Sequence, residues 1–558
     1  MAPGPPRRHR PRADLPAADP RPAHRHPAGP CLRRRCQHPD LVRPQARCHS
    51  ASIGSRRASR RASTPSGIVS PISRRTLLKA ATAGGAVAGI GGFSALSQLF
   101  APLMAGADDG LAAFQPPRSD DIDDASHVLN RLTFGPRPGQ HAEITALGAR
   151  EFIAQQLDPA SIDDRWIESR AARFEALRAW PLGELLEYDA RELLDQLTRK
   201  KILHAVHSKR QLHEVMVDFW SDHFNIDPSK GDSKWLKPAD DREVIRAHAL
   251  GSFPALLKAS ALSPSMLWYL DGRVNRTTDD SERPNENYGR ELLELHSLGV
   301  DGGYTQKDVM EVARCLTGWT VRERAKSGFA VGKVEFRKDL HDDGPKTVLG
   351  TAIPAGLGAG DLDRMIGIVA HHPSTAHYLA EKLCRRFIAD DPPTSAVTAV
   401  ADAFQKSNGE IRPTLAALFN TPEFWSSRGG KTKRPFHFVV STLRATSARS
   451  NAGPALQNHL LRLGHAPFQY PTPDGYPEEA QPWMATLLWR WKFALDFANR
   501  KLEGTNFPAG KLTRAAGGET ALAAHLLGRT PSPDEMAAAT ASGAPLALLI
   551  ASPAFQTF

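Results

Sequence analysis

Cysteine is scarce in this chain, which has five cysteines among 558 residues. Cys31, Cys36 and Cys48 lie within the first seventy residues, so only Cys315 and Cys384 remain further along. One disulfide between these two cysteines remains possible, but two cysteines cannot form a framework of several disulfides. The sequence also lacks a CxxCH haem motif, a phosphate-binding glycine loop and a serine nucleophile elbow, so it offers no motif for the chemistry of those three classes.

An excess of positive charge is lacking over most of the chain, although the formal net charge is +11. Residues 1–70 contain 15 Arg and 3 Asp, whereas residues 71–558 contain 56 basic and 57 acidic residues. The body of the chain is therefore unlike a nucleic-acid-binding protein, and we expect no nucleic-acid partner. Residues 1–68 have no apolar periodicity, so we expect them to be disordered or to be an upstream extension from a gene start placed too early. A basic arm that binds nucleic acid is a third interpretation.

Long apolar runs are also missing after residue 107, so no permanent membrane span is expected there. Residues 73–79 read SRRTLLK, and a run rich in Gly and Ala follows and ends in Ala105-Gly106-Ala107. This order resembles a twin-arginine export signal with Arg74 and Arg75 as its arginine pair and Ala105 and Ala107 as its cleavage motif. It predicts a signal peptide over 69–107, the twin-arginine translocase as a partner during export, and a periplasmic or secreted location.

Apolar residues recur at spacings of three and four over much of the remaining chain, for example in residues 184–224. The pattern predicts a mainly α fold with a large multi-helix body. A small β-hairpin insertion is expected near 329–350, where FAVGKVEF precedes KTVLG. Glycine and proline clusters suggest the domain boundaries: a linker over 108–124, a main helical domain over 125–503, a linker over 504–520, and a C-terminal helical segment over 521–558 that packs on the main domain.

Helix boundaries are marked by short polar motifs. Thr305 stands three residues before Asp308, which is the spacing of a capping box. Residues 415–424 (LAALFNTPEF) and 546–555 (LALLIASPAF) both place Thr or Ser before Pro after an apolar run. Each predicts that one helix ends and a second begins, with the hydroxyl residue as its N-cap.

Residues 284–319 read PNENYGRELLELHSLGVDGGYTQKDVMEVARCLTGW, and further motifs include RLTFGPRPG (131–139), FWSDHFN (219–225), HDDGPKTVLG (341–350) and LLIASPAFQ (548–556). Together they resemble the bacterial family known as domain of unknown function 1800, over roughly residues 125–558. The resemblance implies a large exported protein, often with a twin-arginine signal, and it implies no activity. Members often carry histidine where this chain has Ser221, so a metal site that needs that histidine is in doubt.

A helix over Asn285–Gly299 would place Asn287, Glu291 and Glu294 on one face and Leu292, Leu295 and His296 on the other. Glu291 and Glu294 could hold a cation or act as an acid/base pair. The structural interpretation is an ion-pair network with neighbouring arginines, and for His296 a buried histidine bonded to a backbone carbonyl.

The remaining candidates are His223, which lies near the end of an aromatic segment, and the dipeptide His341-Asp342, for which a turn held by Asp342 is the alternative. The candidate catalytic residues are Glu291, Glu294, His223 and His296. The candidate metal ligands are His223, Glu291, Glu294, His341 and Asp342, with a divalent metal as the cofactor they would hold.

Aromatic side chains are concentrated in residues 468–497, which contain eight of them. They suit a carbohydrate-stacking platform, a docking surface or core packing. Two functions follow from these patterns. We favour a non-catalytic assembly or binding protein that docks a co-exported partner through this aromatic region. The alternative is an exported metal- or carboxylate/His-dependent enzyme, hydrolase-like, that acts on an extracytoplasmic substrate.

Overall fold

The computed structural model describes residues 111–277, 283–323 and 330–558, all of which belong to one unit of the chain, Ala88–Phe558. The expectations for residues 1–68 and for the export signal, with Arg74, Arg75, Ala105 and Ala107, lie outside the described residues.

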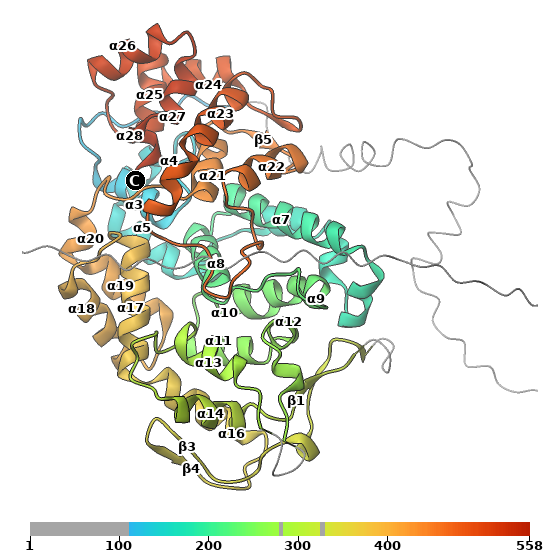
Figure 1. Cartoon of the computed structure of the whole chain (residues 1–558). Coiled ribbons are helices and arrows are strands. Elements are labelled where there is room, and N and C mark those ends of the chain that lie inside the picture. The colour runs from blue at the N-terminus through green and yellow to red at the C-terminus, as the bar shows by residue number, and fades with distance from the viewer. Residues whose placement is uncertain (1–110, 278–282, 324–329) are drawn as a thin grey trace, which may run out of the picture. The chain divides into compact units, whose positions relative to one another are not determined.

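Helices make up most of the described chain (Figure 1). The first half contains α3 (Asp124–Leu132), α4 (Gln140–Leu147), α5 (Ala149–Leu157), α6 (Arg165–Ala171), α7 (Ala190–His207), α8 (Gln211–His223), α9 (Ser233–Asp240), α10 (Arg246–His248), α11 (Phe253–Ala261), α12 (Pro264–Tyr269) and α13 (Asn287–Glu294). A π-helical turn, η5 (Asp241–Ile245), joins α9 to α10. None of the described helices combines the length and apolar character needed to cross a membrane.

The second half continues with α14 (Gln306–Cys315), α16 (Gly360–Ala370), α17 (Pro373–Phe387), α18 (Thr394–Lys406), α19 (Ile411–Asn420), α20 (Pro422–Ser426), α21 (Pro435–Ala445), α22 (Pro454–Arg462), α23 (Leu487–Ala498), α24 (Ala509–Ala516), α25 (Glu519–Leu527), α26 (Pro533–Ala541), α27 (Pro545–Ala551) and α28 (Pro553–Gln556). Short 3₁₀ turns are η2 (Pro159–Ser161), η3 (Glu175–Arg178), η4 (Leu182–Glu187), η6 (Gly272–Val274), η8 (Lys338–Leu340) and η9 (Gln481–Thr486).

The described strands form three small antiparallel pairs: β1 (Trp319–Val321) with β2 (Val334–Phe336), β3 (Lys346–Val348) with β4 (Thr351–Ile353), and β5 (Arg449–Ser450) with β6 (Thr505–Asn506). The prediction of a mainly α fold with small β-hairpins is confirmed. Within the expected region, Val334–Phe336 pairs with Trp319–Val321, and Lys346–Val348 pairs with Thr351–Ile353. Leu349 and Gly350, both at positive φ, form the tight turn that lets β3 pair with β4.

One large hydrophobic core runs through most of the helices. A smaller core lies beneath the segment from α6 to α9 and contains Ile167, Leu193, Leu236 and the ring of Phe468. At one end of the described unit α14 and α16 pack on β3 and β4, and at the other end α24–α28 lie close to α22 and α23 (Figure 1).

The C-terminal helices pack on the rest of this unit. Thr432 and Thr557 form a β-bridge, and the Phe558 amide donates to the Lys431 carbonyl oxygen at 2.8 Å. Residues 504–520, expected to be a linker, instead carry β6 and α24. Their glycines end or separate elements, while Leu512, Ala515 and Ala516 bury one face of α24.

The helix caps are where the sequence places them. Thr305 and Asp308 form a capping box at the start of α14. Thr421 accepts from the Phe424 amide at α20, and Ser552 accepts from the Phe555 amide at α28. Helix α13, by contrast, ends at Glu294 and not at Gly299. The His296 amide donates to the Glu291 carbonyl and the Leu298 amide to the Leu293 carbonyl, so the helix ends in wider turns that span five residues.

Candidate functional site

Two candidate histidines meet where α8 ends and the turn after α13 begins. His223 is the last residue of α8, and its Nε2–H donates to the His296 carbonyl oxygen at 3.1 Å. Their ring centroids are 6.3 Å apart. Burial lowers the pKa of His296 to about 3 and the pKa of His223 well below its usual value, with Lys382 adding to both effects. Both rings are therefore neutral at physiological pH, and neither His296 ring nitrogen has a hydrogen-bond partner among the described residues.

The two candidate carboxylates lie on the half-exposed face of α13, opposite the buried Tyr288 and Leu292. Burial and the neighbouring Glu294 raise the pKa of Glu291. The Tyr304 hydroxyl donates to Glu294 Oε2 at 3.4 Å. Arg290 pairs with Glu286 at 3.3 Å, and no ion pair joins Glu291 or Glu294 to a basic residue in the described part of the chain. The geometry therefore differs from an arginine network.

Tyr378 and Lys382 lie one turn apart on α17, close to the two histidines. The Tyr378 hydroxyl donates to the Leu295 carbonyl at 3.2 Å, and its ring lies 6.3 Å from that of His223. The Lys382 ammonium lies 5.3 Å from the Tyr378 ring centroid. Burial lowers the pKa of Lys382 to about 8, although Glu478, Asp222 and Asp474 act in the opposite direction. We call Tyr378, Lys382, Asp222, Asp474 and Glu478 the Lys382 cluster.

A buried ion-pair network supports one side of this cluster. Arg434, at the start of α21, lies 2.5 Å from Asp218, 2.6 Å from Asp222 and 3.2 Å from Glu478. Lys201 adds a contact of 2.7 Å to Asp218. Burial raises the pKa of Asp222 to about 6, with Asp218 adding to the increase and Arg434 opposing it. The charges on this side are mutually compensated, which is the arrangement that a buried network needs.

The loop that carries Asp474 is fixed against α8. The Asn225 amide nitrogen donates to the Tyr470 carbonyl at 2.9 Å and to the Thr472 carbonyl at 2.7 Å. Gly475 has a φ of 74°, and a Cβ at this position would lie 2.0 Å from the Asp222 carbonyl oxygen. Only glycine allows this approach, so backbone packing fixes the position of Asp474 within the Lys382 cluster.

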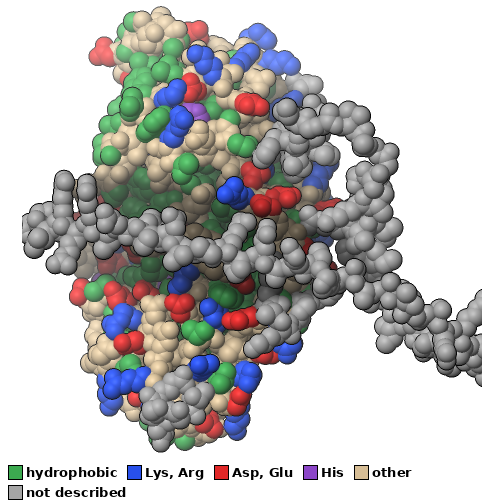
Figure 2. Space-filling model, turned by 45° about the vertical axis from the view of Figure 1, so that its right-hand side comes forward, with side chains coloured by type: hydrophobic (Ala, Val, Ile, Leu, Met, Phe, Trp, Pro, Cys, Tyr) green, Lys and Arg blue, Asp and Glu red, His purple; other side chains and the backbone are tan. Residues whose placement is uncertain are grey.

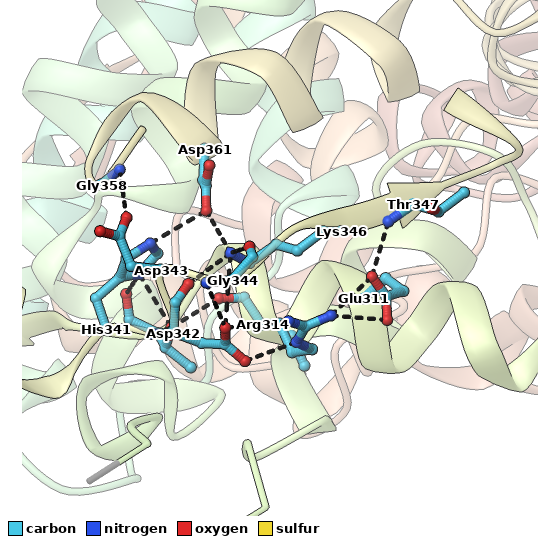
Figure 3. A network of polar contacts seen from close by, with 12 residues as sticks. Glu311, Arg314, His341, Asp342, Asp343, Gly344, Lys346, Thr347, Gly358 and Asp361 are labelled. Atoms are coloured by element: carbon cyan, nitrogen blue, oxygen red, sulfur yellow. Dashed lines mark hydrogen bonds and ion pairs between the residues drawn. The ribbon is translucent and has the colours of Figure 1, made fainter. Parts of the chain in front are cut away.

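His341 and Asp342 lie elsewhere, in a separate polar network (Figure 3). His341 Nε2 lies 3.1 Å from Asp361 Oδ2, and its Nδ1 lies 2.9 Å from the Thr317 carbonyl oxygen. Asp342 accepts two hydrogen bonds from Arg314, at 2.6 and 3.0 Å, and one from the Gly344 amide at 3.0 Å. Lys346 pairs with Asp361 at 2.6 Å. All these groups have partners, so the network fits the interpretation of a turn held by Asp342.

The five candidate metal ligands are not brought together. Within residues 111–277, 283–323 and 330–558, no three His, Cys, Asp or Glu side chains lie where they could share a metal ion. The Lys382 cluster could instead take part in proton transfer, because a lysine with a pKa near 8 is partly neutral close to physiological pH.

Several residues of the Lys382 cluster were not singled out from the sequence. Asp222 directly precedes the candidate His223, and Tyr378 and Lys382 stand four residues apart in a helical pattern. Polar residues at such spacing are the signal that could have found them. The two cysteines outside the N-terminal segment are free and buried, and burial raises the pKa of both thiols to about 12. Their thiols are therefore poor nucleophiles.

The aromatic segment 468–497 divides into a buried and an exposed part. On α23, Phe493, Ala494 and Phe497 are buried. The opposite side of α23 exposes Leu487, Leu488, Trp491 and Leu495, and the preceding turn η9 exposes Met484. We call these five residues the α23 face; Leu488 is 75% exposed and Met484 is 52% exposed. Figure 2 shows hydrophobic side chains among charged ones at the end of the unit where the C-terminal elements lie.

A family model described as "Protein of unknown function (DUF1800)" matches residues 127–557. The chain belongs to this family. Its match covers every described helix from α4 to α28 and includes the candidate residues. The comparisons with curated proteins and with solved structures found no match.

Proposed function

We propose that the protein is exported through the twin-arginine pathway and acts in the periplasm or outside the cell as a non-catalytic assembly or binding protein. It docks a co-exported protein partner on the α23 face. The observation that carries this proposal is the group of five exposed apolar side chains on the outer side of α23 and on the adjoining turn η9, where the inner side of α23 is already buried. Exposed apolar patches of this kind are typical of interaction sites.

A protein partner suits the α23 face better than a sugar does. Four of its five side chains are aliphatic and cannot stack on a sugar ring: Met484, Leu487, Leu488 and Leu495. Trp491 is the one aromatic member of this face. Apolar anchors around a central aromatic side chain are typical of protein interfaces. The twin-arginine pathway moves folded proteins, so a partner bound before export can travel with this chain.

Site-specific photo-crosslinking tests this proposal in cells that produce the full chain. A photoreactive residue at position 488 should form an adduct with one exported protein, identified by mass spectrometry. The matched control is position 147, since Leu147 is an exposed apolar residue on α4. The purified partner should then bind the native protein, and Leu488→Asp should weaken that binding about tenfold or more.

Three outcomes would contradict the docking proposal. They are no adduct from position 488, an adduct only with a second copy of this chain, or the same adduct from position 147. Leu488→Asp is suited to this test because Leu488 contributes little to the core, so the variant should fold normally.

A second function, the carboxylate- and histidine-dependent enzyme, rests on the Lys382 cluster. A lysine with a lowered pKa beside carboxylates, with the pKa of Glu291 raised nearby, is an arrangement often found at active sites. We rank it second, because neither of two cavities found among the described residues is lined by a residue of the Lys382 cluster, by Glu291 or by Glu294.

A further inference from the structure

A cavity of about 830 Å³ lies between the C-terminal ends of α7 and α21 and the N-terminal end of α24. Its volume suits a small organic ligand. Seven Arg and Lys side chains line it against two Asp side chains. This local excess is unusual for a chain whose residues 71–558 have almost equal numbers of basic and acidic residues.

Arg444 forms the buried wall of this cavity, with none of its side chain exposed. Its guanidinium donates to the Gly135 and Val206 carbonyl oxygens, both at 2.7 Å. No carboxylate among the described residues pairs with it. Burial lowers the pKa of Arg444 well below its usual value, and Arg137 adds to this effect. A guanidinium buried without an opposite charge is unfavourable unless an anion is supplied from elsewhere.

Arg137 is a second guanidinium without a counter-ion in the same cavity. It is half-buried, and its side chain forms no hydrogen bond or ion pair within the described part of the chain. Burial lowers its pKa, while Glu143 and Asp164 act through space in the opposite direction. His207 lies beside both arginines. Burial, Arg137 and Arg444 lower its pKa to about 3, so it adds no positive charge near neutral pH.

The two aspartates of the cavity already have partners. Asp164 accepts from the Ser208 hydroxyl at 2.6 Å and from the Lys209 amide at 2.8 Å. Asp163 accepts two hydrogen bonds from Arg165, both at 2.8 Å. Neither forms an ion pair with Arg137 or Arg444, so these two guanidinium groups have no counter-ion among the described residues.

The N-terminus of α24 adds to the positive potential. Its first residues, Ala509 and Gly510, line the cavity, and its N-cap is Pro508, whose side chain can accept no hydrogen bond. The start of a helix favours an anion because its first amide groups point outward and the helix dipole is positive there. Arg500 and Arg514, both exposed, extend the basic lining toward solvent.

We propose that this cavity binds a small organic polyanion that carries phosphoryl groups. Arginine side chains and a helix N-terminus are the groups that recognise phosphoryl oxygens, and each phosphoryl group brings up to about two negative charges. This site goes beyond the docking function on the α23 face and does not depend on it.

Calorimetric titration of the purified protein with tripolyphosphate tests the site, with citrate and with sodium chloride of equal ionic strength as comparisons. Tripolyphosphate should bind and should raise the melting temperature. Arg137→Gln should weaken this binding about tenfold or more, since it removes a charge that faces the ligand. The same variant should melt at the same or a higher temperature without anion, because a charge without a counter-ion has been removed.

A second variant keeps the test independent of the buried wall. This double variant, Arg500→Gln with Arg514→Gln, changes only exposed side chains. It should also weaken the binding of tripolyphosphate about tenfold. The matched control, Lys307→Gln with Lys406→Gln, removes two exposed charges that do not line the cavity and should leave binding unchanged. Tighter binding of citrate would overturn the phosphoryl assignment. The site would be overturned if sodium chloride raised the melting temperature as much as tripolyphosphate does. It would also be overturned if all variants bound tripolyphosphate equally well.

Discussion

Glu291 and Glu294 lie one turn apart on α13, and no described basic residue pairs with them, while burial and mutual repulsion raise the pKa of Glu291. We expect Glu291→Gln to change the free energy of unfolding by less than about 0.5 kcal/mol or to raise it, because the change relieves like-charge repulsion. Thermal melting measures the effect. A clear fall in melting temperature would show that the Glu291 carboxylate stabilises the fold and would end its role as a candidate catalytic residue.

The control for Glu291 is Glu214, a buried carboxylate 2.9 Å from Arg246. Burial alone would raise its pKa, but Arg246 and His204 hold it well below the usual value. Glu214→Gln should lower the free energy of unfolding by about 3 kcal/mol, since Arg246 loses a buried partner.

Lys382 offers a measurement that bears on the enzyme hypothesis. Its pKa of about 8 predicts that acetylation of this amine, followed by mass spectrometry, rises with pH around a midpoint near 8. Asp474 raises that pKa, so Asp474→Asn should move the midpoint to lower pH, whereas Asp402→Asn, an exposed change on α18, should leave it in place. A midpoint near the value of an ordinary lysine, about 10.4, would contradict this environment.

The sequence alone identified only some residues of the candidate site around Glu291 and Lys382. The spacing of Glu291 and Glu294 placed both on one face of α13, which depends on local geometry alone. The approach of Lys382 and Asp474 depends on how α17 and the 470–476 loop pack on α8. That packing joins residues more than 150 positions apart, so periodicity could not reveal it.

At the scale of elements, the two Thr/Ser-Pro motifs make a direct prediction. Thr421 and Ser552 each cap a new helix immediately after the preceding one ends. Thr421→Ala and Ser552→Ala should each lower the free energy of unfolding by about 1 kcal/mol, because an amide of the first turn loses its acceptor. Chemical denaturation measures both, and Thr421→Ser should keep most of the stability. No loss in either alanine variant would contradict the capping role.

Element boundaries set by local hydrogen bonds were predictable, as the capping box at Thr305 shows. The end of α13 was not predictable, because the wide turn after Glu294 accompanies the burial of His296, Ser297 and Leu298 in the interior of the fold. The partner of each strand was not predictable either. Val334–Phe336 pairs with Trp319–Val321, a segment in which the sequence pattern indicated no strand.

For the whole molecule, the most general feature is the number of neutral histidines inside the fold. Seven buried histidines have a pKa below the usual value, in each case chiefly because burial disfavours the charged ring: His127, His223, His296, His437, His459, His465 and His525. In the unfolded chain each titrates near 6.5. Below that pH the unfolded chain binds protons that the folded protein does not.

The protein should therefore lose stability steeply as the pH falls from about 7.5 to about 5.5. The stabilisation is fully present above the unfolded pKa of about 6.5 and is lost as the pH falls toward the folded values, at up to about 1.4 kcal/mol per pH unit for each histidine. Asp222 and Glu291 have a raised pKa, so they favour the folded state as the pH falls and oppose this trend. These two carboxyl groups are outnumbered by the seven histidines. Denaturant midpoints across this range measure the effect, and His525→Gln should reduce the slope by about one histidine's share. An unchanged midpoint from about pH 7.5 to about pH 5.5 would show that these rings accept protons without unfolding.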